Sequence, residues 1–362
     1  LGKEGHGVPW GQIGQVREHA GDRPGDGVEH RVGERLGRVC VGGQAREQHA
    51  ERPPRILVRR ERVGLVVVGP EAALEAGLVD ALNQNGIPAF GPTRAAARIE
   101  TSKVFAKRLM RDAGVPTAEF SVAQSPAEAK RIITDHFSRT SEPVVVKADR
   151  LMAGKGVAVC GTAVEAIAFA ESVGGVLVIE KCLFGVEASL HVLVDGTACA
   201  PLPLARDHKR LLDGDRGPNT GGMGAIAPVL LPVELSVEAL VLQCVRPIAA
   251  ELVSRGTPFR GVIFAGLMID GATPYVLEYN ARFGDPETEV LMPLIADDIV
   301  LHLLLPGGAP VRAHPGAAVA VVLAARGYPA APEKGQAIRG LEGVSDVHLF
   351  HAGTRWDGEC VV

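Results

Sequence analysis

The chain has 362 residues, of which 46% are hydrophobic and 22% charged, so two or three packed units of a soluble globular protein are expected. Its net charge of −4 gives no electrostatic reason to expect nucleic acid or an anionic membrane as a partner, and no apolar run approaches the roughly 20 residues that span a bilayer. Six scattered cysteines without a C-x-x-C pair, and an N-terminus without an apolar signal-peptide core, predict a reduced, cytoplasmic protein.

Residues 1–62 differ from the rest of the chain. They are dense in Gly and Arg, and neither helical nor strand periodicity persists for more than a few residues. Such a segment buries too little apolar surface to offset the entropy lost on ordering it. It is either a disordered extension or a stretch outside the natural reading frame, and the abrupt change at Val63 favours the second interpretation.

An α/β unit with a parallel sheet is predicted over 63–120. The apolar run GLVVVGPEA, which starts at Gly64, ends in Gly-Pro, as expected of a buried parallel strand with a functional loop at its carboxyl end. Residue spacing adds a helix over 72–85, a strand over 87–90 and a helix over 101–113.

Two α+β lobes, 121–187 and 188–315, are predicted next, rather than a single doubly wound sheet. Their helices are expected over 126–135, 164–173 and 235–255. Their strands are expected over 143–147, 156–160, 176–180, 188–194, 198–204, 261–269 and 274–280, with a long polar loop over 206–227. A last strong strand over 317–325 opens a partial β-rich domain over 316–362, in which short strands are expected to continue to Val362.

Two lysines suggest a phosphate site. Lys147 closes the apolar strand VVVK, and Lys155 follows in the loop DRLMAGKG. A lysine that ends a buried strand often only extends its ammonium to solvent. The Gly-Lys-Gly hairpin favours a function, because glycines let backbone N–H groups approach an anion and ammonium groups neutralise phosphate. Gly156 follows Lys155 in place of the Ser or Thr of a Walker A loop, so a covering hairpin is predicted.

Glu180 and Glu187 frame the stretch VLVIEKCLFGVEAS. A backbone edge for adenine and a carboxylate for ribose hydroxyls are both available there. Two exposed acids flanking a turn are an equally good interpretation of the local pattern.

The segment Asp207 to Ala225 is long and polar, although it interrupts a well-patterned lobe. Loops of more than about 12–15 residues without structure are usually functional. Residues 207–210, Asp-His-Lys-Arg, are suited to orienting a charged substrate, and residues 219–222 to donating hydrogen bonds to an oxyanion. For His208, a positioning role is favoured over nucleophilic catalysis.

A metal site is predicted where the chain reads VLEYNARFGDPETE. Glu278 and Asn280 lie two residues apart on a strand and therefore share a face. A carboxylate and an amide oxygen suit Mg²⁺, which takes one or two protein carboxylates plus phosphate oxygens. Arg282 is expected on the same face, where it can pair with a carboxylate or a phosphoryl group. The alternative is a charged strand end beside a turn.

These segments together resemble the ATP-grasp superfamily and, within it, the phosphoribosylamine–glycine ligase family of purine biosynthesis. The similarity extends from about Val63 to Val362 and is most specific in GPNTGGMGA and RFGDPE. It implies an ATP-grasp fold of α/β and α+β parts, with an incomplete N-terminal α/β domain and a truncated C-terminal β-rich domain. It also implies a monomer that uses ATP and Mg²⁺ or Mn²⁺ to convert glycine into glycyl phosphate, which the amine of 5-phosphoribosylamine attacks.

The resemblance also implies roles for individual residues. Those implied for the nucleotide are Lys103, Lys147, Lys155, Gly156, Glu180, Lys181, Leu183 and Glu187. Those implied for the substrates are Glu71, Asp207, Lys209, Pro218, Asn219, Thr220, Gly221, Gly222, Met223, Arg282 and Asp285. Arg282, Asp207 and Asn219 are expected to take part in catalysis, and Glu278 and Asn280 to hold the metal.

The chain departs from the family pattern in three places. Family members usually begin with a glycine-rich G-G-G-G-R-E-H-A loop that helps to seat phosphoribosylamine, whereas the similar string at 42–50 lies too close to GPE. Arg150 and Met152 replace small residues, which predicts a stiffer phosphate loop. The chain stops where the family's C-terminal domain would continue. These departures leave two alternatives to this family assignment. One is another ATP-grasp carboxylate–amine ligase or carboxylase. The other is a nucleotide-binding fragment that is inactive because it lacks the N-terminal substrate loop.

Overall fold

The computed structural model describes residues 38–41, 63–152, 155–231, 235–306 and 308–362. The predictions for 1–62 fall outside these residues, apart from one short strand at 38–41. Contacts within the chain define two compact units. The first comprises the described residues up to 70 with 81–89 and 324–362, and the second comprises 71–80 and 90–323. Every predicted site residue lies in the second unit.

A three-stranded sheet is built from β1 (Arg38–Val41), β2 (Val63–Val67) and β3 (Ala89–Phe90). β1 and β2 are parallel, and Leu65 and Val67 are buried, which confirms the predicted buried parallel strand. The single helix expected over 72–85 is two helices, α2 (Glu71–Glu75) and α3 (Leu78–Gln84). They separate at Gly77, whose φ of +80° lies outside the helical region.

The part of the first unit after residue 324 contains little regular structure. Its described residues form the 3₁₀ turn η4 (Leu341–Gly343) and one isolated bridge between Trp356 and Val361. The prediction of short strands up to Val362 is therefore wrong. The residues around 345–350 are mostly exposed, so alternating hydrophobicity there does not reflect a sheet packed on a core.

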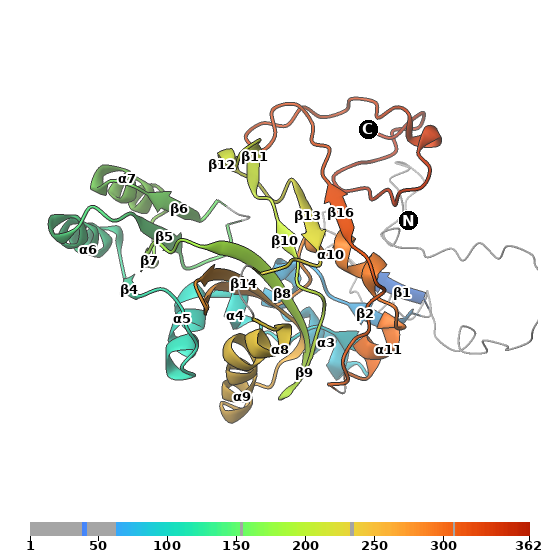
Figure 1. Ribbon diagram of the computed structural model, residues 1–362, viewed down its shortest axis with the longest axis horizontal. Coiled ribbons are helices and arrows are strands. Elements are labelled where there is room, and N and C mark those ends of the chain that lie inside the picture. The colour runs from blue at the N-terminus through green and yellow to red at the C-terminus, as the bar shows by residue number, and fades with distance from the viewer. Residues whose placement is uncertain (1–37, 42–62, 153–154, 232–234, 307) are drawn as a thin grey trace, which may run out of the picture. The chain divides into compact units, whose positions relative to one another are not determined.

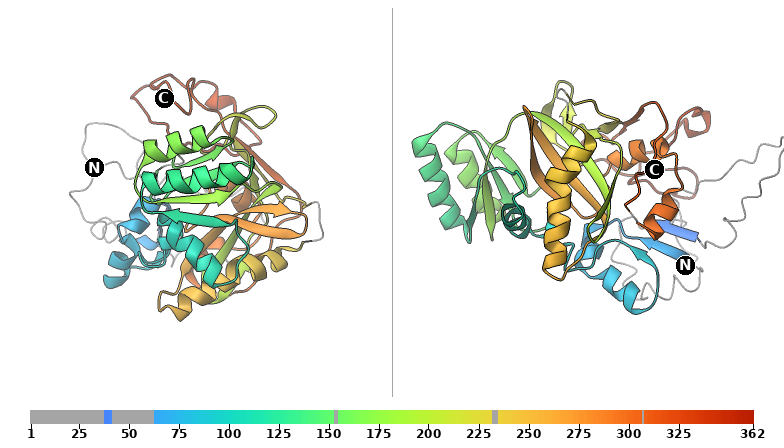
Figure 2. Two further views of the ribbon diagram at one scale, coloured as in Figure 1. Left: turned by 90° about the vertical axis from the view of Figure 1, so that its left-hand side faces the viewer. Right: turned by 60° about the horizontal axis from the view of Figure 1, so that its bottom comes forward.

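The first lobe of the second unit is a four-stranded antiparallel sheet covered by two helices (Figures 1 and 2). Its strand order is β4 (Phe120–Ala123), β7 (Leu177–Lys181), β5 (Val144–Ala148), β6 (Val157–Cys160). Helices α6 (Pro126–Arg139) and α7 (Ala163–Val173) lie side by side on one face, with Ser125 and Thr162 capping their N-termini. The core between the layers is aliphatic, with Ile133, Val146 and Leu177 each at most 1% exposed.

The second lobe is a four-stranded antiparallel sheet in the order β15 (Thr273–Asn280), β14 (Arg260–Asp270), β8 (Val186–Asp195), β9 (Ala198–Pro201). A helical segment packs on it, consisting of α8 (Val237–Leu240), the π-helical turn η2 (Val241–Val245) and α9 (Arg246–Ser254). The predicted regular helix over 235–255 is interrupted in this way because Pro247 has no N–H to donate to the carbonyl of Gln243.

The expected long loop over 206–227 is instead organised as short strands. β10 (Arg206–Asp207) pairs with β13 (Gly224–Ala227), which also pairs with β16 (Ala318–Val321). Between them, β11 (Arg210–Leu212) and β12 (Arg216–Asn219) form a hairpin. The polar composition concealed these strands because they are too short to show a hydrophobic period.

Short helices complete the second unit. The helix expected over 101–113 is observed as α5 (Lys103–Asp112), and a separate short helix, α4 (Arg98–Thr101), precedes it. Ser102 between them is extended, and its hydroxyl accepts a hydrogen bond from the N–H of Phe105, so it caps α5. After β15 come α10 (Glu287–Leu291), the 3₁₀ turn η3 (Met292–Leu294) and α11 (Ile299–Leu304).

Candidate active site

The first residue of α5, Lys103, is held near the strand that carries Lys147. The turn after β5 places the Asp149 carboxylate where it accepts hydrogen bonds from the hydroxyl of Ser102, at 3.0 Å, and from the N–H of Val104, at 2.9 Å. Two lysines predicted to contact ATP are therefore brought together by an acid that the sequence analysis did not single out. The Lys103 ammonium makes no hydrogen bond or ion pair with another described residue.

Three buried charged side chains, those of Lys107, Lys147 and Glu180, are in contact with one another. Glu180 Oε2 lies 3.0 Å from the Nζ of Lys147 and 3.0 Å from the Nζ of Lys107. Lys107 and Glu180 are each 2% exposed, and Lys147 is 6% exposed. Burial, followed by repulsion from Lys147, lowers the pKa of Lys107 to about 8. Sequence reasoning missed Lys107, although a lysine on the apolar face of an amphipathic helix is a signal that could have identified it.

Glu180 is therefore not an exposed acid at a turn. Its Oε1 atom is buried and has no hydrogen-bond partner among the described residues. A buried carboxylate oxygen without a partner is costly, so this atom is suited to accept from a donor on a ligand. Glu187, by contrast, is half-exposed and lies 3.6 Å from the ammonium of Lys209.

The predicted metal residues lie at the end of β15. Alternation along the strand puts Glu278 and Asn280 on one face, and both are half-buried. Burial raises the pKa of Glu278, but Lys147, Lys209 and other nearby cations outweigh it and hold that pKa below its ordinary value. The Glu278 carboxylate, which forms no ion pair or hydrogen bond with another described residue, is thus ionised and available.

Arg282 lies beyond the end of the strand, since β15 stops at Asn280. Its guanidinium is 3.2 Å from Glu100 and 3.8 Å from Glu71. Glu100 also accepts a hydrogen bond from the N–H of Ala281 at 2.8 Å, so it holds both the Arg282 side chain and the residue before it. The prediction that Arg282 shares a strand face with Glu278 and Asn280 is therefore wrong, because the strand ends before Arg282. Glu100, which is buried in α4, was not anticipated because it is 181 residues from Ala281.

The Gly-Asp-Pro turn contacts the glycine-rich segment. A Cβ on Gly222 would lie 2.3 Å from Cδ of Pro286, so the two segments are packed backbone against ring. This contact brings Gly222, and with it Met223, next to Asp285. Pro218 and Asn219 instead lie on the exposed β12 strand. Residues 218–223, which were predicted to act together in one loop, therefore lie in two places: Pro218 and Asn219 on the exposed strand β12, and Gly222 and Met223 beside Asp285.

Thr220 and Lys209 link the two strands of this segment. The Thr220 hydroxyl donates to the carbonyl of Lys209 at 2.8 Å and accepts from the N–H of Gly222 at 3.0 Å. The Lys209 ammonium lies 3.1 Å from Asp207, which is 8% exposed. Burial lowers the pKa of Lys209, but Asp207 and Glu187 outweigh it, so the pKa is raised. Lys209 is thus positively charged at neutral pH.

Three buried polar side chains, His191, Ser189 and Glu287, form hydrogen bonds at or next to the Gly-Asp-Pro turn. The N–H of Gly284 donates to Nε2 of His191 at 3.1 Å, and the hydroxyl of Ser189 donates to Glu287 at 2.9 Å. Burial lowers the pKa of His191 to about 3, so its ring is neutral. Burial, together with Asp207, raises the pKa of Glu287. The sequence analysis found none of these supporting residues.

The remaining predicted nucleotide residues are more peripheral. Lys155 is exposed, and so is Gly221, one of the residues predicted for the substrates. A Cβ on Gly156 would lie 3.0 Å from Cβ of Met152, so this glycine packs against one of the residues expected to stiffen the loop. Lys181 forms a half-exposed ion pair with Glu142 at 3.3 Å. Leu183 follows in the link from β7 to β8.

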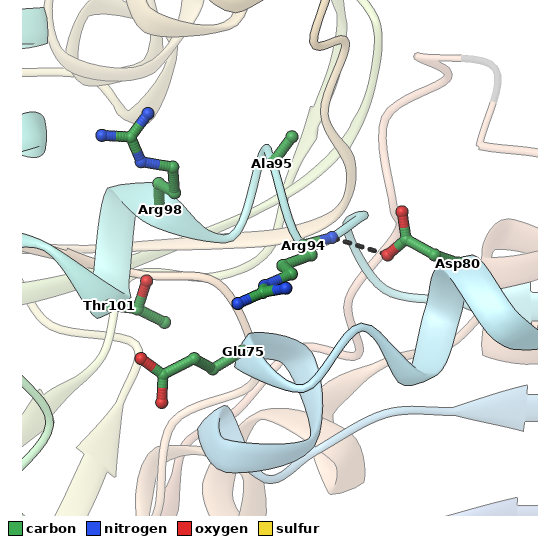
Figure 3. Close-up of a pocket in the computed structure, with 6 residues that line it drawn as sticks. All are labelled: Glu75, Asp80, Arg94, Ala95, Arg98 and Thr101. Atoms are coloured by element: carbon green, nitrogen blue, oxygen red, sulfur yellow. Dashed lines mark hydrogen bonds between the residues drawn. The ribbon is translucent and has the colours of Figure 1, made fainter.

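A separate hollow of about 500 Å³ lies on α2, α3 and α4 (Figure 3). It is lined by Glu75, Asp80, Arg94, Ala95, Arg98 and Thr101. The N–H of Arg94 donates to Asp80 at 2.8 Å. The lining has two arginines and two carboxylates, so it has no excess of either charge, and it contains none of the predicted site residues. The chemistry described above lies elsewhere.

Within the described ranges there is no cluster of three or more His, Cys, Asp or Glu side chains that could hold a metal ion by itself. No helix in the same ranges combines the length and apolar character needed to cross a membrane.

The two α+β lobes, with Lys147 and Glu180 on one and Glu278 and Asn280 on the other, define the ATP-grasp class. Solved biotin carboxylase from Campylobacter jejuni shares this fold at 17% identity, with a TM-score of 0.59, covering 78% of this chain and 69% of that one. Sequence models of phosphoribosylglycinamide synthetase match in all three parts, the N domain at 41–100, the ATP-grasp (A) domain at 101–288 and the C domain at 318–362.

The chain belongs to the phosphoribosylglycinamide synthetase family. Phosphoribosylamine–glycine ligase from Rhodopirellula baltica is 44% identical over 324 residues, covering 84% of this chain and 74% of the relative. The enzyme of the same name from Streptomyces coelicolor is 44% identical over 309 residues, covering 82% and 73%. The crystal structure of the Thermotoga maritima enzyme is 39% identical, with a TM-score of 0.71, and covers 82% of this chain and 74% of that one.

Proposed function

We propose that this chain ligates glycine to 5-phosphoribosylamine at the expense of ATP, giving glycinamide ribonucleotide, ADP and phosphate in purine biosynthesis. Family membership supports the substrates. The observation that carries the chemistry is the convergence of Lys103, Lys147 and an ionised Glu278 on one site of the second unit. We also propose that the protein acts as a monomer in the cytoplasm on these small molecules.

The nucleotide is proposed to lie between the two lobes' charged residues. Lys103 and Lys147 neutralise phosphate oxygens, and the partnerless Oε1 of Glu180 accepts a hydrogen bond from the amino group of adenine. Lys155 and Gly156, in the hairpin between β5 and β6, cover the phosphates. The backbone of Lys181 and Leu183 forms hydrogen bonds with the edge of the adenine ring. Glu187 is half-exposed and accepts from ribose hydroxyls.

Glu278 and Asn280 fit a magnesium or manganese ion. Their oxygens are of the hard type that these ions take, and the low pKa of Glu278 keeps its carboxylate charged. Mg²⁺ usually takes one or two protein carboxylates and completes its shell with phosphate and water. When bound, the ion supplies neutralisation of phosphate charge.

The reaction needs positioning more than covalent help from the protein. The carboxylate oxygen of glycine attacks the γ-phosphorus, the bond from that phosphorus to the bridging oxygen breaks, and ADP leaves with the electron pair. The phosphoribosylamine nitrogen then attacks the acyl carbon, phosphate leaves, and the nitrogen loses a proton. Arg282, held by Glu100, is proposed to face the glycine carboxylate and the transferred phosphoryl group.

The other substrate residues surround this point. Asp207 and Lys209 form one wall, and the glycine-rich segment with Asp285 forms the next. Asn219 is proposed to donate to the developing oxyanion, which requires the exposed β11–β12 hairpin to approach the substrate. The Glu71 carboxylate also lies 3.8 Å from the Arg282 guanidinium and helps to hold it.

ADP release tests this proposal. Wild-type protein is expected to release ADP only when both glycine and 5-phosphoribosylamine are present, and not when bicarbonate replaces glycine. Lys147→Ala and Glu278→Ala are expected to lower the rate at least about 100-fold, because each removes a charge that stabilises the phosphoryl group. The exposed Lys130 on α6 supplies the control, Lys130→Ala, with an unchanged rate. Bicarbonate-dependent release would favour a carboxylase, and ATP binding without any turnover would favour an inactive fragment.

A further inference from the structure

The buried group of Lys107, Glu180 and Lys147 contains two positive side chains and one negative one. Both ammonium groups lie 3.0 Å from the same oxygen, Oε2 of Glu180. A single Lys147–Glu180 pair would have no net charge, so it would attract an anion less strongly than an unpaired ammonium does. With Lys107 present, the group keeps one positive charge in the interior, where water screens it little.

The same lysine is connected to the metal strand. Lys107 donates to the Thr117 hydroxyl at 2.6 Å, and that hydroxyl donates to the carbonyl of Val276 at 2.6 Å. Lys147 donates to the next carbonyl, that of Leu277, at 3.0 Å. The same edge of the strand is also held by the backbone, since the N–H of Val276 donates to the carbonyl of Pro116 at 2.8 Å. Glu278 is the next residue after these two anchored carbonyls.

We propose that Lys107 is a positioning residue for the nucleotide: it neutralises Glu180 so that Lys147 retains its charge for phosphate, and through Thr117 it holds the strand that carries Glu278. Lys107 itself is 2% exposed and touches no substrate. This inference rests on the proposed ATP-dependent function of the site. It explains why α5, β5, β7 and β15 are joined by buried charges where apolar side chains would otherwise pack.

Substitutions at Lys107 and Thr117 test the inference through the KM for ATP. Lys107→Met keeps the length of the side chain but leaves Lys147 neutralised by Glu180, so the KM for ATP is expected to rise about tenfold, as for loss of one charge-assisted interaction. The KM for glycine is expected to stay within about twofold. Lys107→Arg retains the charge and is expected to recover most of the affinity. Thr117→Val is expected to raise the KM for ATP about threefold, as for one neutral hydrogen bond.

Equilibrium binding of MgATP at different pH values gives a readout that a purely structural role would not move. The charged groups facing Lys107 are Glu180 on β7, Lys147 on β5 and Glu278 on β15. Because the pKa of Lys107 is about 8, the wild-type Kd is expected to weaken about fivefold between pH 7 and pH 9.5 as the ammonium loses its proton. Lys107→Arg is expected to remove this change, because a guanidinium stays charged.

Arg108 supplies a matched control, since it is the next residue of α5 and is exposed. Arg108→Met is expected to keep the wild-type KM and pH dependence. If Lys107→Met does not fold, as judged by circular dichroism, Lys107→Arg and Thr117→Val still decide the question. Unchanged KM values for ATP in folded variants, or the same pH dependence in Lys107→Arg and wild type, would overturn the inference. Failure of wild-type turnover with intact MgATP binding would instead count against the proposed function alone.

Discussion

Gly284 offers a test of how tightly the active-site turn is held. Its φ lies outside the left-handed region that favours glycine, so any effect of substitution comes from crowding. A Cβ there would lie 2.6 Å from Oε2 of Glu287 and 2.8 Å from Nε2 of His191. Ordinary contacts begin at 3.4 Å, so the two atoms must retreat by 0.8 Å (3.4 − 2.6) and 0.6 Å (3.4 − 2.8). Both side chains are buried and have no solvent into which to move.

The displacement has a cost in stability and in catalysis. Overpacking of this kind costs about 1–3 kcal/mol of unfolding free energy. The hydrogen bond from Gly284 to His191 must also lengthen, which moves the turn that follows Arg282. Misplacing a reacting group by about 1 Å can cost roughly 100-fold in rate. Gly284→Ala is therefore expected to lose about 1–3 kcal/mol of stability and between about 10- and 100-fold in kcat.

Urea unfolding and ADP release at saturating substrates measure the two effects separately. Gly161→Ala is the control, because its Cβ would meet only Oε2 of Glu165 at 3.8 Å and its φ also lies outside the left-handed region. The control is expected to match wild type in both assays. An unfolding free energy within about 0.5 kcal/mol of wild type for Gly284→Ala, together with an unchanged kcat, would refute the close-packed geometry of this turn.

Three further predictions follow from other contacts. Gly222→Ala combines a φ of +131° with a Cβ only 2.3 Å from Pro286, so urea unfolding is expected to show a loss of about 1–3 kcal/mol, and an unchanged midpoint would contradict that contact. Glu278→Gln removes the charge proposed for the metal, so calorimetry is expected to show ATP affinity that no longer depends on Mg²⁺, and a wild-type metal dependence would exclude Glu278 as a ligand. The pKa of Lys107 is about 8 in the folded protein, against an ordinary value of 10.5. Between pH 8 and pH 10.5 the unfolded chain therefore binds more protons than the folded one, so the free energy of unfolding rises with pH. The rise is at most about 3 kcal/mol (2.5 × 1.36). Lys107→Met is expected to lack this increment, and parallel stability curves for the two proteins between pH 7.5 and pH 10.5 would contradict the buried-ammonium assignment.

Much of the fold could be predicted from local patterns. The buried strand at β2, the strand–helix order of the first lobe and the long strands β14 and β15 all have clear hydrophobic periods, and their observed bounds differ from prediction by only a few residues. The segment 206–227 could not be predicted as strands, because β10 has two residues and β11 has three. The interruption of the helix near Pro247 is predictable from the sequence, because a proline within a helix has no N–H to donate.

The sequence by itself determined which residues are proposed to face a ligand. Glu278 and Asn280 share a face because alternation along a strand is a local property. Lys147 is the next-to-last residue of β5, directly after the apolar run. The family resemblance added Lys103 and the remaining ligand residues, whose roles stay predictions.

Only the tertiary structure decided which residues support that chemistry. Lys107 meets Glu180 and Lys147, and Glu100 meets Arg282, through contacts between segments far apart in the chain. Ser102 and Asp149, which join α5 to β5, are 47 residues apart. Such pairs leave no period in the sequence, because each partner is placed by a different element and the free energy of burying the charge is offset only when both arrive together.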